Sequence, residues 1–324
     1  MDIKRQYLKT GRYIAISTKG NVIIRDANFI NIFITLKVYL RSKFSSKVRY
    51  YNHIEQDNEL PKFNKIIYRN IDGQILGFDF HNNHLYRVYN DEVQFIQHKS
   101  GYTTIDKIFK LNKVEFISNN TTKEKLIKGK LLREASSSKQ NEVFKDIVER
   151  YNNALRKEKF IYNNPRINTE TFFDEIFKRD FPADMLKYIE KEKDNIAETF
   201  KNIQWIWSHS DLTPDNIMFD NNEYYIIDTE RCEVLPAMYD IVNLILTITM
   251  SNNVNPLESY FDGEYDALVR SVISKKYISK TDRKNLVLIM LVLKSILSWD
   301  KFVKKNEGYF SRSRWNVFKY KFIE

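Results

Sequence analysis

One stretch of the chain combines residue types and spacings that phosphoryl-transfer chemistry requires. It runs from 209 to 230 and contains Asp211, Asn216 and Asp228. A carboxylate such as that of Asp211 can accept a proton from an attacking hydroxyl group. The oxygens of Asn216 and Asp228 are hard ligands that suit magnesium, which usually takes one or two protein carboxylates together with substrate phosphates. The stretch therefore predicts a general base beside a metal site.

The elements around these residues can be predicted from the same stretch. The apolar runs 217–219 and 224–227 flank a polar turn at 220–223, a pattern typical of a β-hairpin. A hairpin returns the chain antiparallel, so we expect Asp228 to lie beside Asn216. Pro214 lies in the connection between Asp211 and Asn216, where it fixes one backbone dihedral and removes an amide donor. The alternative is a chance His-x-Asp sequence followed by an ordinary hairpin.

The whole pattern resembles the aminoglycoside phosphotransferase and choline kinase superfamily, which has a protein kinase-like fold. That family shows His-x-Asp, an Asn five residues after the Asp, a hairpin, Ile-Asp-x-Glu, and then a Pro followed by Tyr-Asp at the start of a helix. The matching residues here are His209, Asp211, Asn216, Ile227, Asp228, Glu230, Pro236, Tyr239 and Asp240. The resemblance implies an α+β protein of two lobes, with an antiparallel β small lobe and a mainly helical large lobe.

The resemblance also implies a role for each residue of the motif. Asp211 would be the catalytic base, and Asn216 and Asp228 would hold magnesium against the phosphates of ATP. His209 is expected to pack and form a hydrogen bond behind the loop rather than to act as a base. Asp240 is expected to hold the loop backbone. Glu230 would lie close to the metal without binding it directly.

We expect three parts along the chain. Residues 1–60 would be an N-terminal extension that packs on the small lobe, with a hairpin formed by 14–16 and 22–24. Residues 61–134 would be the β-rich, nucleotide-binding small lobe, and 135–324 the helical catalytic and substrate lobe. The predicted small-lobe strands are 66–68, 75–80, 85–89, 93–96, 114–117 and 123–132. The predicted helices are 143–155, 172–177, 185–200, 236–250 and 283–303.

The small lobe contains no glycine-rich phosphate loop. The turns at 82–83 or 90–91 would have to approach the phosphates instead. The family's strand lysine also has no clean counterpart: Arg87 lies in a strand of the right order, and Lys99 follows the next predicted strand. Either could bind the ATP phosphates, or both could be surface charges. If neither binds them, the protein could be a pseudokinase that binds nucleotide without turnover.

The charge and composition of the chain indicate where the protein works and which partners it can bind. The single cysteine, Cys232, suits a reducing cytoplasm, and no secretory signal opens the sequence. The apolar run 29–40 is too short to span a membrane; it could be an interfacial helix or an element packed on the small lobe. Residues 270–324 hold fourteen Lys or Arg against four Asp or Glu, which equals the net charge of +10 of the whole chain.

That basic segment favours an anionic partner. Peripheral contact with the inner face of an anionic membrane, or with a glycan, is expected; a solvated basic helix face is the alternative, and no nucleic acid is expected. A cationic acceptor would call for an acidic substrate lobe. We therefore expect a cytoplasmic, ATP- and magnesium-dependent phosphotransferase that acts on a hydroxyl group of a saccharide or cell-surface glycan. A small-molecule kinase of choline or aminoglycoside type is the alternative enzyme.

Overall fold

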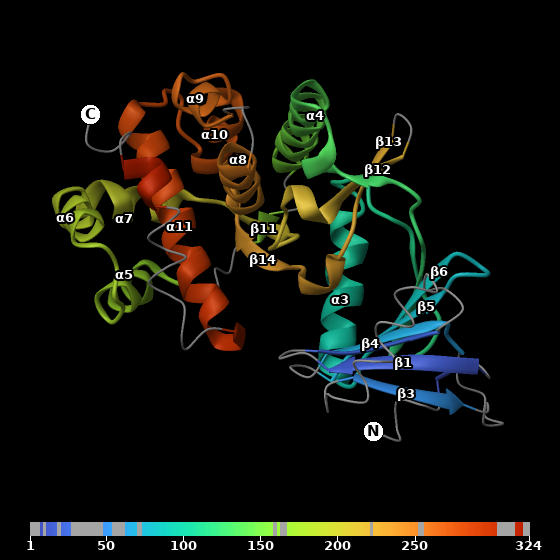
Figure 1. The fold of residues 1–324 in the computed structure, drawn as a ribbon. Coiled ribbons are helices and arrows are strands. Elements are labelled where there is room, and N and C mark those ends of the chain that lie inside the picture. Colours follow the sequence, from blue (N-terminus) through green and yellow to red (C-terminus); the bar gives the residue numbers. More distant parts are fainter. Residues whose placement is uncertain are drawn as a thin grey trace. The chain divides into compact units, whose positions relative to one another are not determined.

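The computed structural model describes residues 7–8, 11–17, 21–26, 48–53, 62–69, 73–157, 161–162, 167–220, 223–251, 256–302 and 315–319. The chain divides into two compact units (Figure 1). Unit 1 contains 1–99 and 112–128, and unit 2 contains 100–111 and 129–324. The expected three-part division with boundaries at 60 and 134 stays a prediction. The run 29–40 lies outside the described residues.

Unit 1 is built on an antiparallel sheet. Its described strands are β1 (Gly11–Ser17), β2 (Asn21–Asp26), β3 (Val48–His53), β4 (Lys65–Arg69), β5 (Ile75–Asp79), β6 (His84–Val88), β7 (Val114–Phe116) and β8 (Thr121–Lys125). They pair in the order β3-β1-β2-β4-β5-β6-β8-β7. The predicted hairpin of 14–16 and 22–24 is confirmed, with Ala15 opposite Ile24. Because β2 pairs with β4, this hairpin extends the sheet of the small lobe.

One face of this sheet carries the apolar core of unit 1. Alternate residues on neighbouring strands, such as Ile66, Ile75 and Val88, pack together with Phe63. Gly77 in β5 allows the Phe63 ring to lie against the backbone, because a Cβ atom at this position would lie 2.3 Å from the ring. In β5 burial alternates with a period of two, which is the expected signature of a strand with one covered face.

The predicted strand at 93–96 is wrong, since these residues begin helix α3 (Glu92–Ile105). The Asp91 side chain accepts a hydrogen bond from the Val93 amide at 2.8 Å, and the Asp91 carbonyl accepts one from the Phe95 amide at 3.2 Å. Asp is a favoured residue at a helix N-terminus, and Glu92 adds negative charge to the first turn. This capping signal outweighs the β propensity of Val93 and Phe95. Lys99 therefore lies in a helix rather than after a strand.

Unit 2 combines helices with two small sheets. Its helices are α4 (Ser137–Leu155), α5 (Thr169–Phe177), α6 (Ala183–Lys191), α7 (Lys193–Asn202), α8 (Tyr239–Ser251), α9 (Pro256–Phe261), α10 (Asp266–Ile273) and α11 (Lys280–Phe302). One sheet has the order β10 (Ile161–Tyr162), β11 (Trp205–Ser208), β14 (Glu233–Pro236). The other has the order β13 (Glu223–Ile226), β12 (Ile217–Asp220), β9 (Lys130–Leu131).

The helical predictions for this unit are largely confirmed. The apolar stripe of α4 is buried as expected, and Ser136 caps its first turn by accepting a hydrogen bond from the Lys139 amide. The single helix predicted over 185–200 is instead divided at Glu192 into α6 and α7. The helix predicted from 236 begins at Tyr239, because Pro236 ends strand β14. No helix in the described part of the chain combines the length and hydropathy needed to span a bilayer.

Helix α11 begins with a reciprocal cap. The Asp282 amide donates to the Ser279 hydroxyl at 3.0 Å, and the Ser279 amide donates to the Asp282 carboxylate at 2.9 Å. Lys275 adds an ion pair to the same carboxylate at 2.9 Å. Burial alone would raise the pKa of Asp282, but the hydrogen bonds from Ser279 and the Lys275 ammonium outweigh it and lower the pKa below 3.8.

Replacing Asp282 with Asn is expected to lower the free energy of unfolding by about 1 kcal/mol at neutral pH, since it weakens this cap. The lowered pKa means that the carboxylate stabilises the fold above pH 3.8 and loses this effect as the pH falls through its folded pKa. The difference between wild type and D282N should therefore vanish in acid. Urea unfolding across pH measures it, with D174N on the exposed surface of α5 as the control. A constant difference at all pH values would contradict the assignment.

Candidate active site

The loop that carries Asp211 leaves strand β11, which lies between β10 and β14. Ser210 follows with a φ of 68°, a left-handed conformation that turns the chain sharply. The Ser210 hydroxyl donates to the Arg231 carbonyl at 2.7 Å. The loop then ends in a single turn of 3-10 helix, η4 (Pro214–Asn216), before β12 begins. Pro214, which fixes one backbone dihedral, is the first residue of this turn.

Asp240 holds the backbone of this loop, as predicted. Its carboxylate accepts the amides of His209 at 2.7 Å and Ser210 at 3.0 Å, and it is fully buried at the start of α8. Burial raises the pKa of Asp240, and the two amide hydrogen bonds and Lys294 only partly offset this effect. A buried carboxylate that accepts two backbone amides fixes the direction of the loop at the residues just before Asp211.

His209 lies behind the loop, which also confirms the prediction. Its ring is fully buried, and Nε2 lies 2.8 Å from the Ile227 carbonyl. Since a carbonyl can only accept, Nε2 carries the proton and donates it. This contact joins the Asp211 loop to the residue immediately before Asp228. His209 is thus a structural link between the two halves of the motif.

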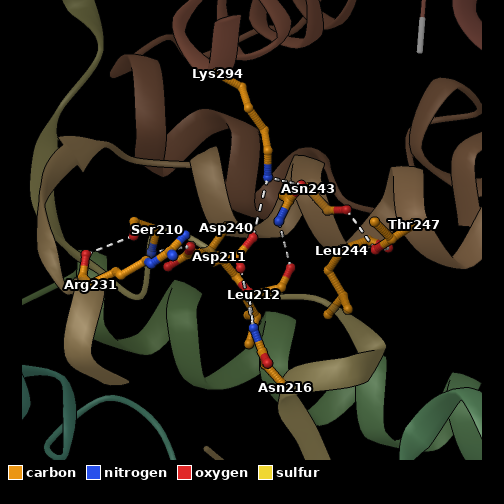
Figure 2. Close-up of polar contacts among 10 residues, drawn as sticks. All are labelled: Ser210, Asp211, Leu212, Asn216, Arg231, Asp240, Asn243, Leu244, Thr247 and Lys294. Carbon is orange, nitrogen blue, oxygen red and sulfur yellow. Dashed lines mark hydrogen bonds and ion pairs between the residues drawn. The ribbon is translucent and has the colours of Figure 1, made fainter. Parts of the chain in front are cut away.

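Asp211 and Asn216 face each other across the loop (Figure 2). The Asn216 side-chain amide donates to the Asp211 carbonyl at 2.7 Å, and its nitrogen lies 3.5 Å from an Asp211 carboxylate oxygen. The side chain of Asp211 is 42 % exposed, so its carboxylate is accessible from solvent. With its nitrogen used inside the loop, Asn216 presents its oxygen as the remaining polar atom.

The hairpin brings Asp228 back to Asn216 as expected. Strands β12 and β13 pair antiparallel with Ile217 opposite Ile226. One step further, the Ile227 amide donates to the Asn216 carbonyl at 2.9 Å. Asp228 follows with a φ of 62°, a left-handed conformation that is uncommon for a residue other than glycine. Such conformations concentrate at functional sites, where the surrounding structure imposes them.

The donor set fits a hard divalent cation. It consists of one amide oxygen and one carboxylate on adjoining backbone segments, and magnesium takes its other ligands from phosphates and water. Within the described residues, no group of three or more His, Cys, Asp and Glu side chains forms a metal cage. Glu230, the predicted outer residue, follows in the turn after Asp228; its side chain is largely buried and lies 3.9 Å from Arg231.

Three contacts within unit 2 hold the hairpin in place. Gly129 lets the chain pass close to β12, because a Cβ atom there would lie 2.2 Å from the Phe219 carbonyl. Lys110 forms an ion pair with Glu223 at 3.0 Å. From α4, Asp146 accepts a hydrogen bond from the Tyr224 hydroxyl. The metal-binding candidates are therefore positioned by a braced hairpin rather than by a free loop.

Lys294 is a residue of this site that sequence reasoning missed. It lies on α11, and its ammonium is 3.7 Å from an Asp211 carboxylate oxygen and 2.6 Å from the Asn243 side-chain oxygen. Asn243 in turn donates to the Leu212 carbonyl at 2.8 Å (Figure 2). The sequence counted Lys294 only as one charge of the basic C-terminal segment, because it lies 83 residues after Asp211.

The two candidates for phosphate binding lie in unit 1. Arg87 in β6 is 3 % exposed, and its Nε atom lies 3.7 Å from Glu124 of the neighbouring strand β8. Lys99 is exposed on α3, with its ammonium 5.9 Å from the centre of the Phe116 ring. Arg87 is therefore a buried member of an ion pair, whereas Lys99 lies on the surface of the unit. Their roles toward ATP stay predictions.

Comparison with known proteins gives a family match over the segment that contains the site. Residues 148–270 match the model of the phosphotransferase enzyme family. A search of curated protein sequences found no match.

Similar solved structures were also found. A choline/ethanolamine kinase family protein from Mesorhizobium loti is 10 % identical over 78 % of this chain and 85 % of its own, with a TM-score of 0.49. A choline kinase from Streptococcus pneumoniae is 12 % identical over 77 % of this chain and 89 % of its own, with a TM-score of 0.46. An aminoglycoside phosphotransferase from Streptomyces rimosus is 11 % identical over 68 % of this chain and 90 % of its own, with a TM-score of 0.44.

Proposed function

We propose that this chain is a phosphotransferase of the aminoglycoside phosphotransferase and choline kinase superfamily and moves the γ-phosphate of ATP to a hydroxyl group of a saccharide or cell-surface glycan. The match of residues 148–270 to the phosphotransferase enzyme family supports the first part of this proposal. The observation that carries the proposal is the junction of Asp211, Asn216 and Asp228. The Asn216 amide holds the Asp211 segment, and the Asn216 carbonyl accepts the amide next to Asp228. Base and candidate metal ligands thus belong to one hydrogen-bonded unit.

The chemistry follows from what each side chain can do. The acceptor hydroxyl would donate a hydrogen bond to the exposed Asp211 carboxylate, which takes the proton as the oxygen attacks the γ-phosphorus. A new oxygen–phosphorus bond forms, the bond to the bridging oxygen breaks, and the electron pair leaves with ADP. Asn216 and Asp228 would hold magnesium, which, when bound, neutralises charge on the phosphates. Asp240 and His209 keep the loop and the hairpin in register during this step.

A saccharide acceptor is favoured by charge. The basic segment 270–324 suits an anionic partner better than a cationic one. Part of this charge is used internally, however: Lys275 pairs with Glu198 and Asp282, and Arg283 pairs with Asp266. The proposed peripheral contact with an anionic membrane or glycan in the cytoplasm therefore depends on the other basic residues of the segment, of which Lys304 and Lys305 lie outside the described residues.

A transfer assay with three acceptor classes tests this proposal. Purified protein is incubated with magnesium and ATP labelled at the γ-phosphate, together with lipopolysaccharide core fragments, choline or an aminoglycoside. We expect label in the saccharide fraction. Label confined to choline or to the aminoglycoside would establish the small-molecule alternative instead. Nucleotide binding without transfer to any acceptor would favour a pseudokinase and overturn the proposal.

A further inference from the structure

We propose that Lys294 is a specificity-determining residue that selects acceptors by charge: it favours hydroxyl compounds with an anionic group beside the reactive hydroxyl and disfavours cationic ones. This inference rests on the proposed function, because it assumes that an acceptor binds at Asp211. Lys294 is placed for this role by contacts at both ends of its side chain. The stem arises from the buried face of α11, and the ammonium reaches the catalytic loop.

The ammonium is built into the site rather than lying on the surface. Its side chain is 11 % exposed, while that of Asp211 is 42 % exposed. The Asn243 oxygen accepts from the ammonium at 2.6 Å, and Asn243 is itself held by its bond to the Leu212 carbonyl and by the Thr247 hydroxyl, which donates to the Asn243 carbonyl at 2.8 Å. The Tyr239 ring lies 5.9 Å from the charge. A buried cation held in this way keeps one position (Figure 2).

Distance determines what this charge does to an acceptor. A hydroxyl that donates to Asp211 lies within about 3 Å of its carboxylate. The hydroxyl oxygen therefore lies within about 7 Å of an ammonium that is 3.7 Å from the same carboxylate, and substituents on the neighbouring carbons lie within about 10 Å of it. At partly buried sites, charges at such distances change binding by about tenfold or more, with a sign that depends on the acceptor.

The loop itself supplies no competing cation. Residues 209–216 contain Asp211 and Asp215 but no Lys or Arg. Asp215 is paired with Arg133 at 3.0 Å, so its charge is already compensated. In the described part of the chain, the ion pair of Asp211 is formed with Lys294. Lys294 thus places a positive charge 3.7 Å from the carboxylate of Asp211, at the position where the acceptor hydroxyl would bind.

The test measures acceptor preference with three sugars of one skeleton: glucuronate, glucose and glucosamine. Products are quantified by mass spectrometry in a mixture with magnesium and ATP, for the full chain and its variants. We expect the wild type to favour glucuronate over glucosamine by about tenfold or more. K294Q, which keeps a donor for Asn243, should lose most of this preference, and K294R should retain it. K284M is the matched control, since Lys284 lies on the same helix and is equally buried at 9 %.

A second variant keeps the test decisive if K294Q does not fold. N243D places a carboxylate against the Lys294 ammonium without changing side-chain volume, and should shift the preference toward glucosamine. The wild type could hydrolyse ATP without transferring phosphate to any of the sugars. In that case we expect glucuronate to inhibit ATP hydrolysis more strongly than glucosamine does.

The outcomes separate the two proposals. Preference that is unchanged in both K294Q and N243D would overturn the role of Lys294 and leave the proposed function intact. If no part of the ATP consumption depends on Asp211, both proposals are overturned.

Discussion

Replacing Asp211 with Asn is expected to lower the rate of phosphoryl transfer by about 10²–10⁴-fold, the contribution of a positioned general base. Asn keeps the size of the side chain but cannot take the proton from the acceptor. The backbone carbonyl of residue 211 still accepts from Asn216, so the loop should keep its shape. The loss is therefore expected in kcat, with little change in the binding of ATP.

The neighbouring carboxylate provides the control for this experiment. Asp215 lies in the same loop, but its side chain is exposed and pairs with Arg133. D215N should retain transfer within about twofold, because exposed ion pairs contribute little. Equal activity of D211N and wild type would show that the base lies elsewhere.

Replacing Asp240 with Asn is expected to lower the free energy of unfolding by about 2–3 kcal/mol and to reduce transfer strongly. The Asp240 carboxylate accepts two backbone amides inside the protein, and an Asn side chain has one oxygen for them. One buried amide is then left facing an amino group, which carries the cost of an unsatisfied donor. Thermal or urea unfolding of D240N, with the exposed D106N as control, measures the first effect.

The sign of the Asp240 pKa shift adds a check on the same residue. Because burial raises the pKa of Asp240 above its ordinary value of 3.8, the carboxylate takes up a proton more readily in the folded state. Taken alone, this group therefore stabilises the fold as the pH falls toward 3.8. Protonation nevertheless removes an acceptor from the loop. Activity of the wild type should therefore fall in mild acid before the protein unfolds. Loss of activity and fold at one pH would contradict this explanation.

The parts of the site that depend on local sequence could be predicted. The hairpin at 217–226 follows from two apolar runs around a polar turn, and the position of Asp228 beside Asn216 follows from the hairpin. The α+β class, with an antiparallel sheet and a mainly helical second part, was likewise accessible and is confirmed. The motif also indicated the family, and the matching family model covers residues 148–270, which contain the motif. The start of α3 differs from the prediction because the short apolar run 93–96 favours a strand, whereas the hydrogen bond from the Val93 amide to the Asp91 side chain caps a helix.

The parts that depend on tertiary packing could not be predicted. Lys294 reaches Asp211 only because α11 packs beside α8, and no spacing in the sequence reports that contact. The same holds for the Asp282 ion pair with Lys275 and for the pairing of Arg283 with Asp266. Counting charges along 270–324 treated these residues as one basic surface, whereas the fold uses several of them inside unit 2.

Metal binding in the presence of nucleotide tests the central claim most directly. Binding of manganese, a spectroscopic substitute for magnesium, can be measured by electron paramagnetic resonance with a non-hydrolysable ATP analogue. We expect nucleotide-dependent binding in the wild type and in D220N, whose substitution lies at the far end of β12. D228N should weaken this binding by about tenfold or more. Manganese binding that is equally tight in D228N would contradict the assignment of the hairpin as the metal site.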